Sequence, residues 1–459
     1  MDRLDIFDRA RGFQKRVPVN GGSRNKNLEY IKNRLNGTVI QDGPASILKI
    51  EYDIPGITAH GSVVLGDVYS VDTGLLEVLL PEFSRFNNGG FKGGECKGSE
   101  FRDAGLKGEG FEGNGVRGSD FKEDGQVLKD LLFFDLETTG LSGGAGTHAF
   151  LIGFLKIADE GIRVTQYFLI NLSSERLLLK YVREHMTSGT VLVSYNGKSF
   201  DYNILKSRYI LNGFNQAEDD PVHLDLLYTS RRIWKGLFSD FSLQTVENMA
   251  LQFNRTGDIP GYRVPEVYFQ YLRGRDVCDE LYAVFIHNKN DILSLLALLV
   301  KQLGLVRRGI EMDRTKAKGI GEPINPVSLS NMLFNGNLVE EAKSLLNVYS
   351  DDAEALKKLG LLCKKQKLTG EALNCFELLT ERAEKFSDYI FACTEVAKLY
   401  EHVLKDIEKA FFYTEKVWKK VKRRDFFYPD HANLYSREKE AIEKRLRRLE
   451  KKLAAVKRF

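Results

Sequence analysis

Three consecutive apolar runs, each followed by a turn, constrain the fold of this chain more than any other feature. LKDLLFFDLET, AFLIGFLKI and VTQYFLINL are rich in β-branched and aromatic residues and are separated by Gly-containing stretches, which predicts an antiparallel meander. A Ser-Ser pair then opens a predicted helix, SERLLLKYVREHM, and TVLVSYN follows as a fourth strand. This succession indicates an α/β fold with a mixed sheet covered by helices.

Helices dominate the sequence after the fourth strand. We predict them at residues 199–213, 223–234, 242–252, 265–273 and 277–303. With the four strands they define a domain at residues 127–303.

Two segments precede this domain. Residues 1–80 contain short alternating runs such as SILKIEY, which predict a small N-terminal region with a few strands of no readable role. Residues 81–126 change abruptly to Gly, Phe and charged side chains. Because glycines are costly to order and isolated phenylalanines cannot offset that cost, we predict a disordered linker without chemistry.

The sequence after the domain is predicted to be helical. A polar linker at residues 304–324 leads to residues 325–421. Six residues there fall on the spacing of a tetratricopeptide (TPR) unit: Leu356, Leu359, Gly360, Cys363, Ala372 and Phe376. Weaker copies surround Ala342 and Ala410 at irregular intervals. TPR-like helical repeats usually bind a protein partner, but a plain helical buttress for the first domain is nearly as well supported.

Basic residues concentrate near the end of the chain. The formal net charge is only +4, yet residues 401–459 hold 18 Lys or Arg against 10 Asp or Glu. Residues 422–459 are therefore predicted to form a basic helical tail. Such a tail could hold a phosphate backbone, but helices rich in Lys, Arg and Glu are more often simply solvated, and we favour that interpretation.

Several classes of protein are disfavoured by what the sequence lacks. The five cysteines form no CxxC pair and no regular spacing, so neither a zinc site nor a disulfide framework is indicated. No stretch reaches the roughly 18 unbroken apolar residues of a membrane-spanning helix, and the start, MDRLDIFDRARGFQKR, has no apolar core of a secretion signal. We therefore expect a cytoplasmic protein that does not contact the membrane.

Two carboxylates share one side of the first strand of the meander. Successive side chains in a strand alternate between faces, so Asp135 and Glu137 in LLFFDLETTG project the same way. Two carboxylates in a low-dielectric environment repel each other unless they stay protonated or a cation neutralises them. A solvent-exposed strand end would explain the pair at least as often, so this motif alone indicates little.

Two further segments carry acids where apolar elements begin. Asp201 lies at a predicted strand-to-helix junction, where a carboxylate near free helix amides is common. His287 and Asp291 are four residues apart and so lie on one face of a long predicted helix, just before the apolar stretch Ile292 to Leu299. A lone mid-helix acid at that place is most simply explained by an Arg or Lys partner elsewhere in the chain.

Taken together, these segments resemble a known group of enzymes. The arrangement of Asp135-x-Glu137, then Asp201, then His287 with Asp291 is similar to the three motifs of the DEDD superfamily of DnaQ-like exonucleases. YNGKSFD, HLDLLYTSRRIW, IPGYRVPEVYFQYL and HNKNDILSL resemble the YprB-like ribonuclease H-like family over about residues 127–303. The resemblance implies a ribonuclease H-like fold and a metal-dependent nuclease acting on DNA or RNA, in the 3′ to 5′ direction.

The resemblance also implies roles for single residues. Asp135, Glu137, Asp201 and Asp291 would be the metal ligands, and oxygen ligands of this kind select Mg²⁺ or Mn²⁺, with two ions expected. His287, as a neutral imidazole with an ordinary pKa of about 6.5, would accept the proton of the attacking water. The family places a His five positions, or a Tyr four positions, before the last Asp, whereas this chain has His at four. The metal ligands are therefore better defined than the general base.

Other polar residues are weaker candidates. His223 and Asp225 alternate near the same sheet, but a His and an Asp at a strand end are more often satisfied by backbone groups. Four cations are candidates for holding the phosphate chain, or are plain surface charge: Lys198, Arg231, Arg232 and Lys235.

Two other functions fit the same sequence. The domain could be a noncatalytic nucleic-acid-binding or scaffold module whose working surface is the TPR-like region. It could also be a structure-selective endonuclease with the same acids and a different substrate cleft. The presence of all four acids argues against loss of catalysis.

Overall fold

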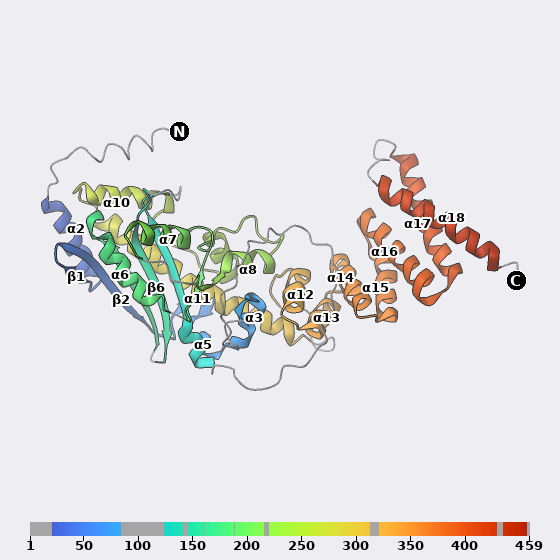
Figure 1. The fold of residues 1–459 in the computed structure, drawn as a ribbon, viewed down its shortest axis with the longest axis horizontal. Coiled ribbons are helices and arrows are strands. Elements are labelled where there is room, and N and C mark those ends of the chain that lie inside the picture. Colours follow the sequence, from blue (N-terminus) through green and yellow to red (C-terminus); the bar gives the residue numbers. More distant parts are fainter. Residues whose placement is uncertain are drawn as a thin grey trace. The chain divides into compact units, whose positions relative to one another are not determined.

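The computed structural model describes residues 21–83, 124–140, 146–159, 161–187, 189–214, 220–312, 321–428 and 435–456 (Figure 1). The chain divides into two compact units. Unit 1 comprises Met1–Arg231 and Phe238–Gly304, and unit 2 comprises Arg232–Leu237 and Leu305–Phe459. Most of the predicted disordered linker, and Cys96 within it, lies outside the described residues.

The predicted meander is the centre of the unit 1 sheet. Strands β5 (Leu131–Thr138), β6 (Ala149–Ala158) and β7 (Gly161–Leu169) pair antiparallel in sequence order. Strand β8 (Val191–Ser194) lies parallel to β5, and β9 (Val222–Asp225) lies parallel to β8. The α/β fold with a mixed sheet, expected from the pattern of apolar runs, is confirmed.

The N-terminal strands extend the same sheet. Strands β1 (Thr38–Asp42) and β2 (Ala45–Ile54) form a hairpin, and β2 pairs antiparallel with β7. Within the described residues the sheet therefore has seven strands, in the order β1-β2-β7-β6-β5-β8-β9. The region before residue 80 thus continues the sheet, which gives its short strands the role that the sequence did not show.

The remaining short elements of the N-terminal region flank the sheet. A helix precedes β1, and a small two-stranded sheet and three short helical segments follow β2. Their bounds are α2 (Gly21–Arg34), β3 (Ala59–His60), β4 (Val63–Val64), η2 (Leu65–Ser70), η3 (Thr73–Leu75) and α3 (Leu76–Leu79).

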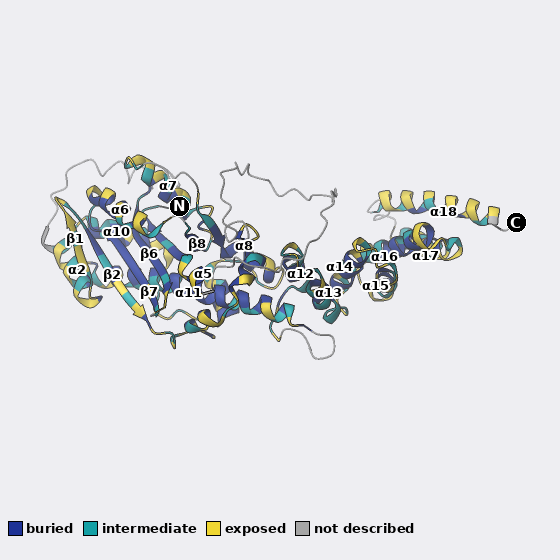
Figure 2. Cartoon of the chain, turned by 60° about the horizontal axis from the view of Figure 1, so that its bottom comes forward, coloured by how far each residue is buried: buried dark blue, intermediate teal, exposed yellow. Residues whose placement is uncertain are grey.

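The helical elements of unit 1 from residue 124 onward are α5 (Asp124–Asp130), η4 (Leu172–Ser174), α6 (Glu175–His185), α7 (Asp201–Leu211), α8 (Leu226–Ile233), α9 (Leu243–Val246), η5 (Glu247–Leu251), η6 (Gly261–Arg263), α10 (Val264–Leu272) and α11 (Cys278–Ile310). They include α6, α10 and α11, which lie along the sheet (Figure 2). The helix predicted at 223–234 is wrong at its start, because residues 223–225 pair with β8 as part of β9. The helix predicted to end at 303 continues to Ile310.

The long helix α11 packs closely on the middle of the sheet. A Cβ atom at Gly153 of β6 would lie 2.2 Å from Ile292 Cδ1 and 2.3 Å from Asn288 Oδ1, so a larger residue there would force these side chains of α11 to shift. The buried Gln166 of β7 donates to the Phe285 carbonyl at 2.9 Å and to Asn288 Oδ1 at 2.8 Å. Helix α11 has the length and composition of a membrane span, but 67% of its apolar window is buried within the protein, as in a core helix.

Among the described residues of unit 2, the regular secondary structure is helical. Its helices are α12 (Pro326–Asn335), α13 (Val339–Val348), α14 (Ala353–Lys365), α15 (Thr369–Arg382), α16 (Phe386–Lys398), η7 (Leu399–Leu404), α17 (Ile407–Phe427) and α18 (Ser436–Val456). Gly360 of α14 faces the ring of Phe376 on α15, where a Cβ would lie 2.5 Å from the ring edge. This close packing of α14 on α15 agrees with the small residue that the sequence places there.

Candidate metal centre

Strand β5 presents its two acids to helix α11. Asp135 pairs in register with Gly153, against which the α11 residues Asn288 and Ile292 pack. The side-chain amide of Asn288 donates to Asp135 Oδ2 at 2.8 Å and to the Asp135 carbonyl at 3.3 Å. Because side chains alternate along a strand, Glu137 faces the same helix one step further along.

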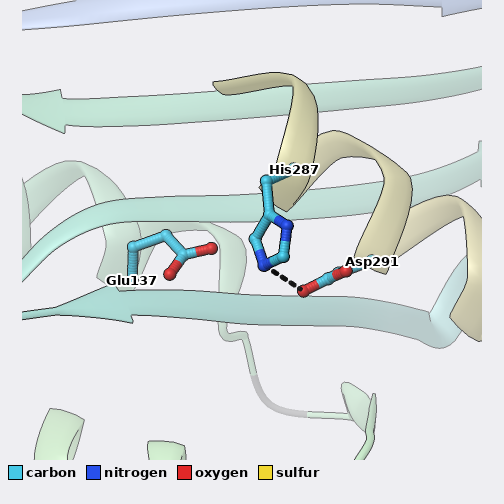
Figure 3. A group of neighbouring side chains, drawn as sticks. All are labelled: Glu137, His287 and Asp291. Carbon is cyan, nitrogen blue, oxygen red and sulfur yellow. Dashed lines mark ion pairs between the residues drawn. The ribbon is translucent and has the colours of Figure 1, made fainter. Parts of the chain in front are cut away.

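Helix α11 contributes a histidine and an acid to the same place. Figure 3 shows His287 and Asp291 on successive turns of α11, with Glu137 approaching from β5. One ligand atom from each of these three side chains lies within 4.8 Å of the others. His287 Nε2 is 3.6 Å from Asp291 Oδ2. From the sequence we expected an acid of β5 to meet the third motif, His287 with Asp291. In the structure Glu137 and these two side chains form one compact group.

Asp201 joins the cluster from a third element. It is the first residue of α7 and is buried. The turn before α7 is tight, because a Cβ at Gly197 would lie 2.5 Å from Ser194 Oγ and 3.1 Å from Asp201 Oδ2. Asp135 and Asp201 stand outside the tight group of three, but the charge of Asp201 raises the pKa of both Asp135 and Glu137. We refer to Asp135, Glu137, Asp201 and Asp291 as the acid cluster.

The acid cluster is crowded and poorly neutralised. Burial is the largest cause that raises the pKa of Asp135 and Glu137 well above their ordinary values, and the neighbouring acids, with Asp291 first, add to it. Burial, followed by the charges of Asp225 and Asp291, raises the pKa of Asp201 to about 7. Within the part of the chain that the structure describes, Glu137 Oε1 is buried and has no hydrogen-bond partner. These features fit a divalent cation, because hard oxygen ligands without thiols suit Mg²⁺ or Mn²⁺.

A buried arginine that sequence reasoning did not identify holds one edge of the acid cluster. The Arg255 side chain is 5% exposed and donates to both Glu247 oxygens, at 2.8 and 2.5 Å, and to Asp258 at 2.9 Å. It also donates to Asp291 Oδ1. The simplest explanation of a mid-helix acid, a basic partner elsewhere in the chain, is thus correct for Asp291. No local signal in FNRTGDIP marks Arg255 as that partner, because the contact spans 36 residues.

Asp258 fixes the orientation of His287. Its carboxylate lies 2.8 and 3.0 Å from His287 Nδ1, which leaves Nε2 directed toward Asp291. Burial lowers the pKa of His287, but the hydrogen bond to Asp258 and the charge of Asp291 outweigh burial, so the pKa is raised. The pKa of His287 is therefore shifted above the ordinary imidazole value that we assumed from sequence. The cause is a pair of acids on opposite sides of the ring.

His223 and Asp225 are placed differently from the acid cluster. Leu132 pairs with Leu192, and Leu192 pairs with His223, so His223 and Asp225 face the side of the sheet opposite Asp135. Asp225 Oδ1 accepts from the amides of residues 196 and 227 at 2.8 and 3.0 Å, and Oδ2 accepts from that of residue 198 at 3.2 Å. As expected for an acid at a strand end, Asp225 is satisfied by backbone groups, and it holds the turn that leads to Asp201.

His223 is buried and contacts a serine of the neighbouring strand. Its Nε2 lies 2.7 Å from Ser194 Oγ, while its Nδ1 is buried without a partner. Burial, followed by the charge of Lys198, lowers its pKa to about 3. The four candidate phosphate-holding cations, Lys198, Arg231, Arg232 and Lys235, are all exposed, as either interpretation of them requires.

Comparison with known proteins places this geometry in a family. Residues 132–303 match the model of the RNase_H superfamily, and this range contains the whole acid cluster. Over 332 residues the chain is 30% identical to "Uncharacterized protein YprB" of Bacillus subtilis (strain 168), an alignment that covers 72% of this chain and 77% of that protein. The chain belongs to the YprB family. In this member of the YprB family, the acid cluster lies within the matched superfamily domain.

Proposed function

We propose that this YprB-family chain is a metal-dependent nuclease that hydrolyses phosphodiester bonds of DNA or RNA. The RNase_H superfamily domain supports a nucleic-acid hydrolase in general terms. The observation that carries the proposal is the buried, unpartnered Oε1 of Glu137 beside three further acids. A buried carboxylate without a partner is costly, and a cation supplied from solution removes that cost.

The ligands would come from three elements. The closest group of possible ligands is Glu137, His287 and Asp291. Its two acids would hold the ion, and Asp135 and Asp201 would add further oxygen ligands. When bound, Mg²⁺ or Mn²⁺ lowers the pKa of water and stabilises charge on the phosphoryl oxygens. Two ions and 3′ to 5′ exonuclease action are the finer parts of the proposal, and both rest on the resemblance of the three motifs to DEDD exonucleases.

Side chains of the protein would orient the metal ligands and accept the proton of the attacking water. Asp258 holds Nδ1 of His287, so that Nε2 is the nitrogen available to accept a proton from water. Arg255 occupies Asp291 Oδ1 and leaves Oδ2 toward the cluster. Asn288 likewise donates to Asp135 Oδ2. Each of these two acids therefore has one oxygen committed to the protein, which fixes its orientation toward a ligand.

The test is a cleavage assay on the full chain. Labelled single-stranded and duplex DNA and RNA are incubated with Mg²⁺, Mn²⁺ or chelator, using wild type, Asp135→Ala and the exposed control Glu266→Gln. We expect metal-dependent cleavage by wild type and by the control, and loss of cleavage in Asp135→Ala. Substrates blocked at either end distinguish exonuclease from endonuclease action. Equal cleavage by wild type and Asp135→Ala would identify a contaminant and refute the proposal.

One observation favours a second candidate function. Because Arg255 already pairs with Asp291, one of the four acids is partly neutralised by the chain itself. This suits a module that binds nucleic acid without cutting it, with the TPR-like interpretation of unit 2 and its protein partner as further predictions. Binding of nucleic acid without cleavage under any metal condition would support this candidate over the nuclease.

A further inference from the structure

The positive charges of helix α18 are largely paired within the protein. Arg448 and Lys452 bind the buried carboxylate of Glu401 at 2.8 and 2.9 Å. Further pairs join the helix to itself or to α17: Lys439 with Asp425, Lys444 with Glu440, and Arg447 with Glu443. Much of the basic surplus of residues 422–459 thus serves to dock and stabilise α18.

Helix α17 has a different distribution of charge. Its buried residues, Ala410, Thr414, Val417 and Val421, lie on one side of the helix. The opposite side carries exposed cations and aromatic rings, spaced three or four residues apart as far as Phe426 and followed directly by Phe427. We call these residues the α17 stripe: Phe412, Lys416, Lys419, Arg423, Phe426 and Phe427. At 1.5 Å per residue, the stripe is about 22 Å long.

The α17 stripe is open to a ligand. Phe412, Phe426 and Phe427 are 55%, 81% and 60% exposed, which is unusual for rings of this size. Among the described residues, Lys416 and Arg423 have no ion pair, and Lys419 pairs only with the half-buried Glu415 on its own helix, at 2.8 Å. Lys416 lies over the Tyr413 ring at 5.7 Å and Arg423 over the Phe427 ring at 5.8 Å, so their contacts with rings stay within α17. The stripe therefore combines exposed cations with aromatic rings that remain more than half exposed.

We propose that the α17 stripe binds single-stranded nucleic acid, an inference that rests on the proposed function. Cations at the spacing of one helical turn can contact successive phosphates, and exposed rings provide surfaces on which unpaired bases stack. A lipid surface fits less well, because a membrane-bound helix needs a continuous apolar face, and the apolar face of α17 is already buried in unit 2. An acidic protein would use the cations but leaves the three rings unexplained.

The test measures binding of labelled 20-nucleotide oligo-dT and oligo-U to the full chain by fluorescence anisotropy, in chelator so that no substrate is cut. The charge variant is Lys416→Gln with Lys419→Gln and Arg423→Gln. A matched variant removes three cations from α18 instead: Lys444→Gln, Arg447→Gln and Lys451→Gln. We expect the α17 variant to weaken binding by about tenfold or more and to lower the salt slope by about 2, since each phosphate contact on a single strand contributes about 0.7. The α18 variant should change both much less.

A second variant tests the rings. Phe426→Ser with Phe427→Ser should weaken binding by about fivefold or more and leave the salt slope unchanged, because stacking does not release counterions. Circular dichroism and melting curves show whether each variant is folded. Equal losses from the α17 and α18 charge variants would mean that only overall charge matters, and would overturn the proposal. Binding to anionic vesicles, but not to oligonucleotides, would overturn it in favour of a lipid surface.

The outcomes separate this inference from the proposed function. If the wild-type chain binds oligonucleotides through the α17 stripe but cleaves nothing with Mg²⁺ or Mn²⁺, the stripe stands and the nuclease proposal fails. The opposite result is cleavage of oligonucleotides to the same extent by wild type and by the α17 charge variant, with no loss of binding in that variant for short or long strands. That result would leave the nuclease proposal standing and refute binding by the α17 stripe.

Discussion

Two buried glutamates, one in each unit, have opposite surroundings. The Glu401 side chain in unit 2 is fully buried, and it is met by Arg448, Lys452 and, at 3.8 Å, Arg445. Burial raises its pKa, but the hydrogen bonds from Arg448 and Lys452 outweigh burial and lower the pKa to about 2. Glu137 in unit 1 is also buried, yet among the described residues its Oε1 has no hydrogen-bond partner, and burial with the neighbouring acids raises its pKa. Cations of the chain bind the Glu401 carboxylate directly, whereas the described contacts of Glu137 include no such ion pair.

Arg255 neutralises the buried acids of unit 1 only in part. Its hydrogen bonds go to Glu247, Asp258 and Asp291. Burial and the neighbouring acids raise the pKa of Glu137, and the charge of Arg255, which lowers it, has a smaller effect than these. The contrast with Glu401 therefore separates acids that stabilise a fold from acids that are available to a ligand.

The two glutamates should differ most in how a bound metal ion changes the stability of the unit that contains them. At a hundred times its Kd, Mn²⁺ is expected to raise the free energy of unfolding of unit 1 by about 2.7 kcal/mol. Glu137→Gln should remove most of this gain without lowering metal-free stability, because it also removes a repelling charge. Hydrogen exchange of the full chain, read at peptides covering β5 and α11, measures the effect locally. A full Mn²⁺ response in Glu137→Gln would refute the role of Glu137 as a ligand.

Glu401→Gln should have the opposite consequence in unit 2. Losing the charge-assisted hydrogen bonds is expected to destabilise α16 to α18 by about 2 kcal/mol at pH 7, with the Mn²⁺ response of unit 1 intact. Because the folded pKa of Glu401 is lowered to about 2, its stabilisation is complete above the unfolded pKa of about 4.3 and is lost as the pH falls toward 2. The difference between wild type and variant in hydrogen exchange should therefore shrink across that range. A constant difference from pH 7 to pH 2 would contradict the assignment.

Local patterns in the sequence predicted the elements of unit 1 well. Alternation and β-branched residues are properties of short windows, so β5, β6, β7 and β8 could be located, and with them the shared face of Asp135 and Glu137. The pairing of β2 with β7 could not be predicted, because it joins residues more than 100 positions apart and alternation does not name a partner strand. For the same reason the sequence required a cation for Asp291 but did not identify Arg255.

Electrostatic properties were the least predictable part of the site. The pKa of His287 depends on Asp258, which approaches from a loop 29 residues away and was not a candidate. The basic tail was identified from composition, but composition does not distinguish Arg448, which is bound to Glu401, from Arg423, which is exposed on α17. Such distinctions depend on which side of a helix is covered, and that is decided by tertiary packing.

A single substitution should turn the Glu137 environment into one that resembles that of Glu401. His287→Lys would place a permanent cation near Glu137 and Asp291, at a position whose present side chain already lies 2.8 Å from Asp258. The gain in metal-free stability is expected to be about 1 kcal/mol, a rise in melting temperature of about 2 to 4 °C for a unit of this size, and the Mn²⁺ response should be lost. His287→Gln is the matched neutral control and should lose the ion pairs without gaining stability. If His287→Lys were no more stable than His287→Gln and still responded fully to Mn²⁺, the acid cluster would not be limited by missing positive charge, and the contrast between the two glutamates would have another cause.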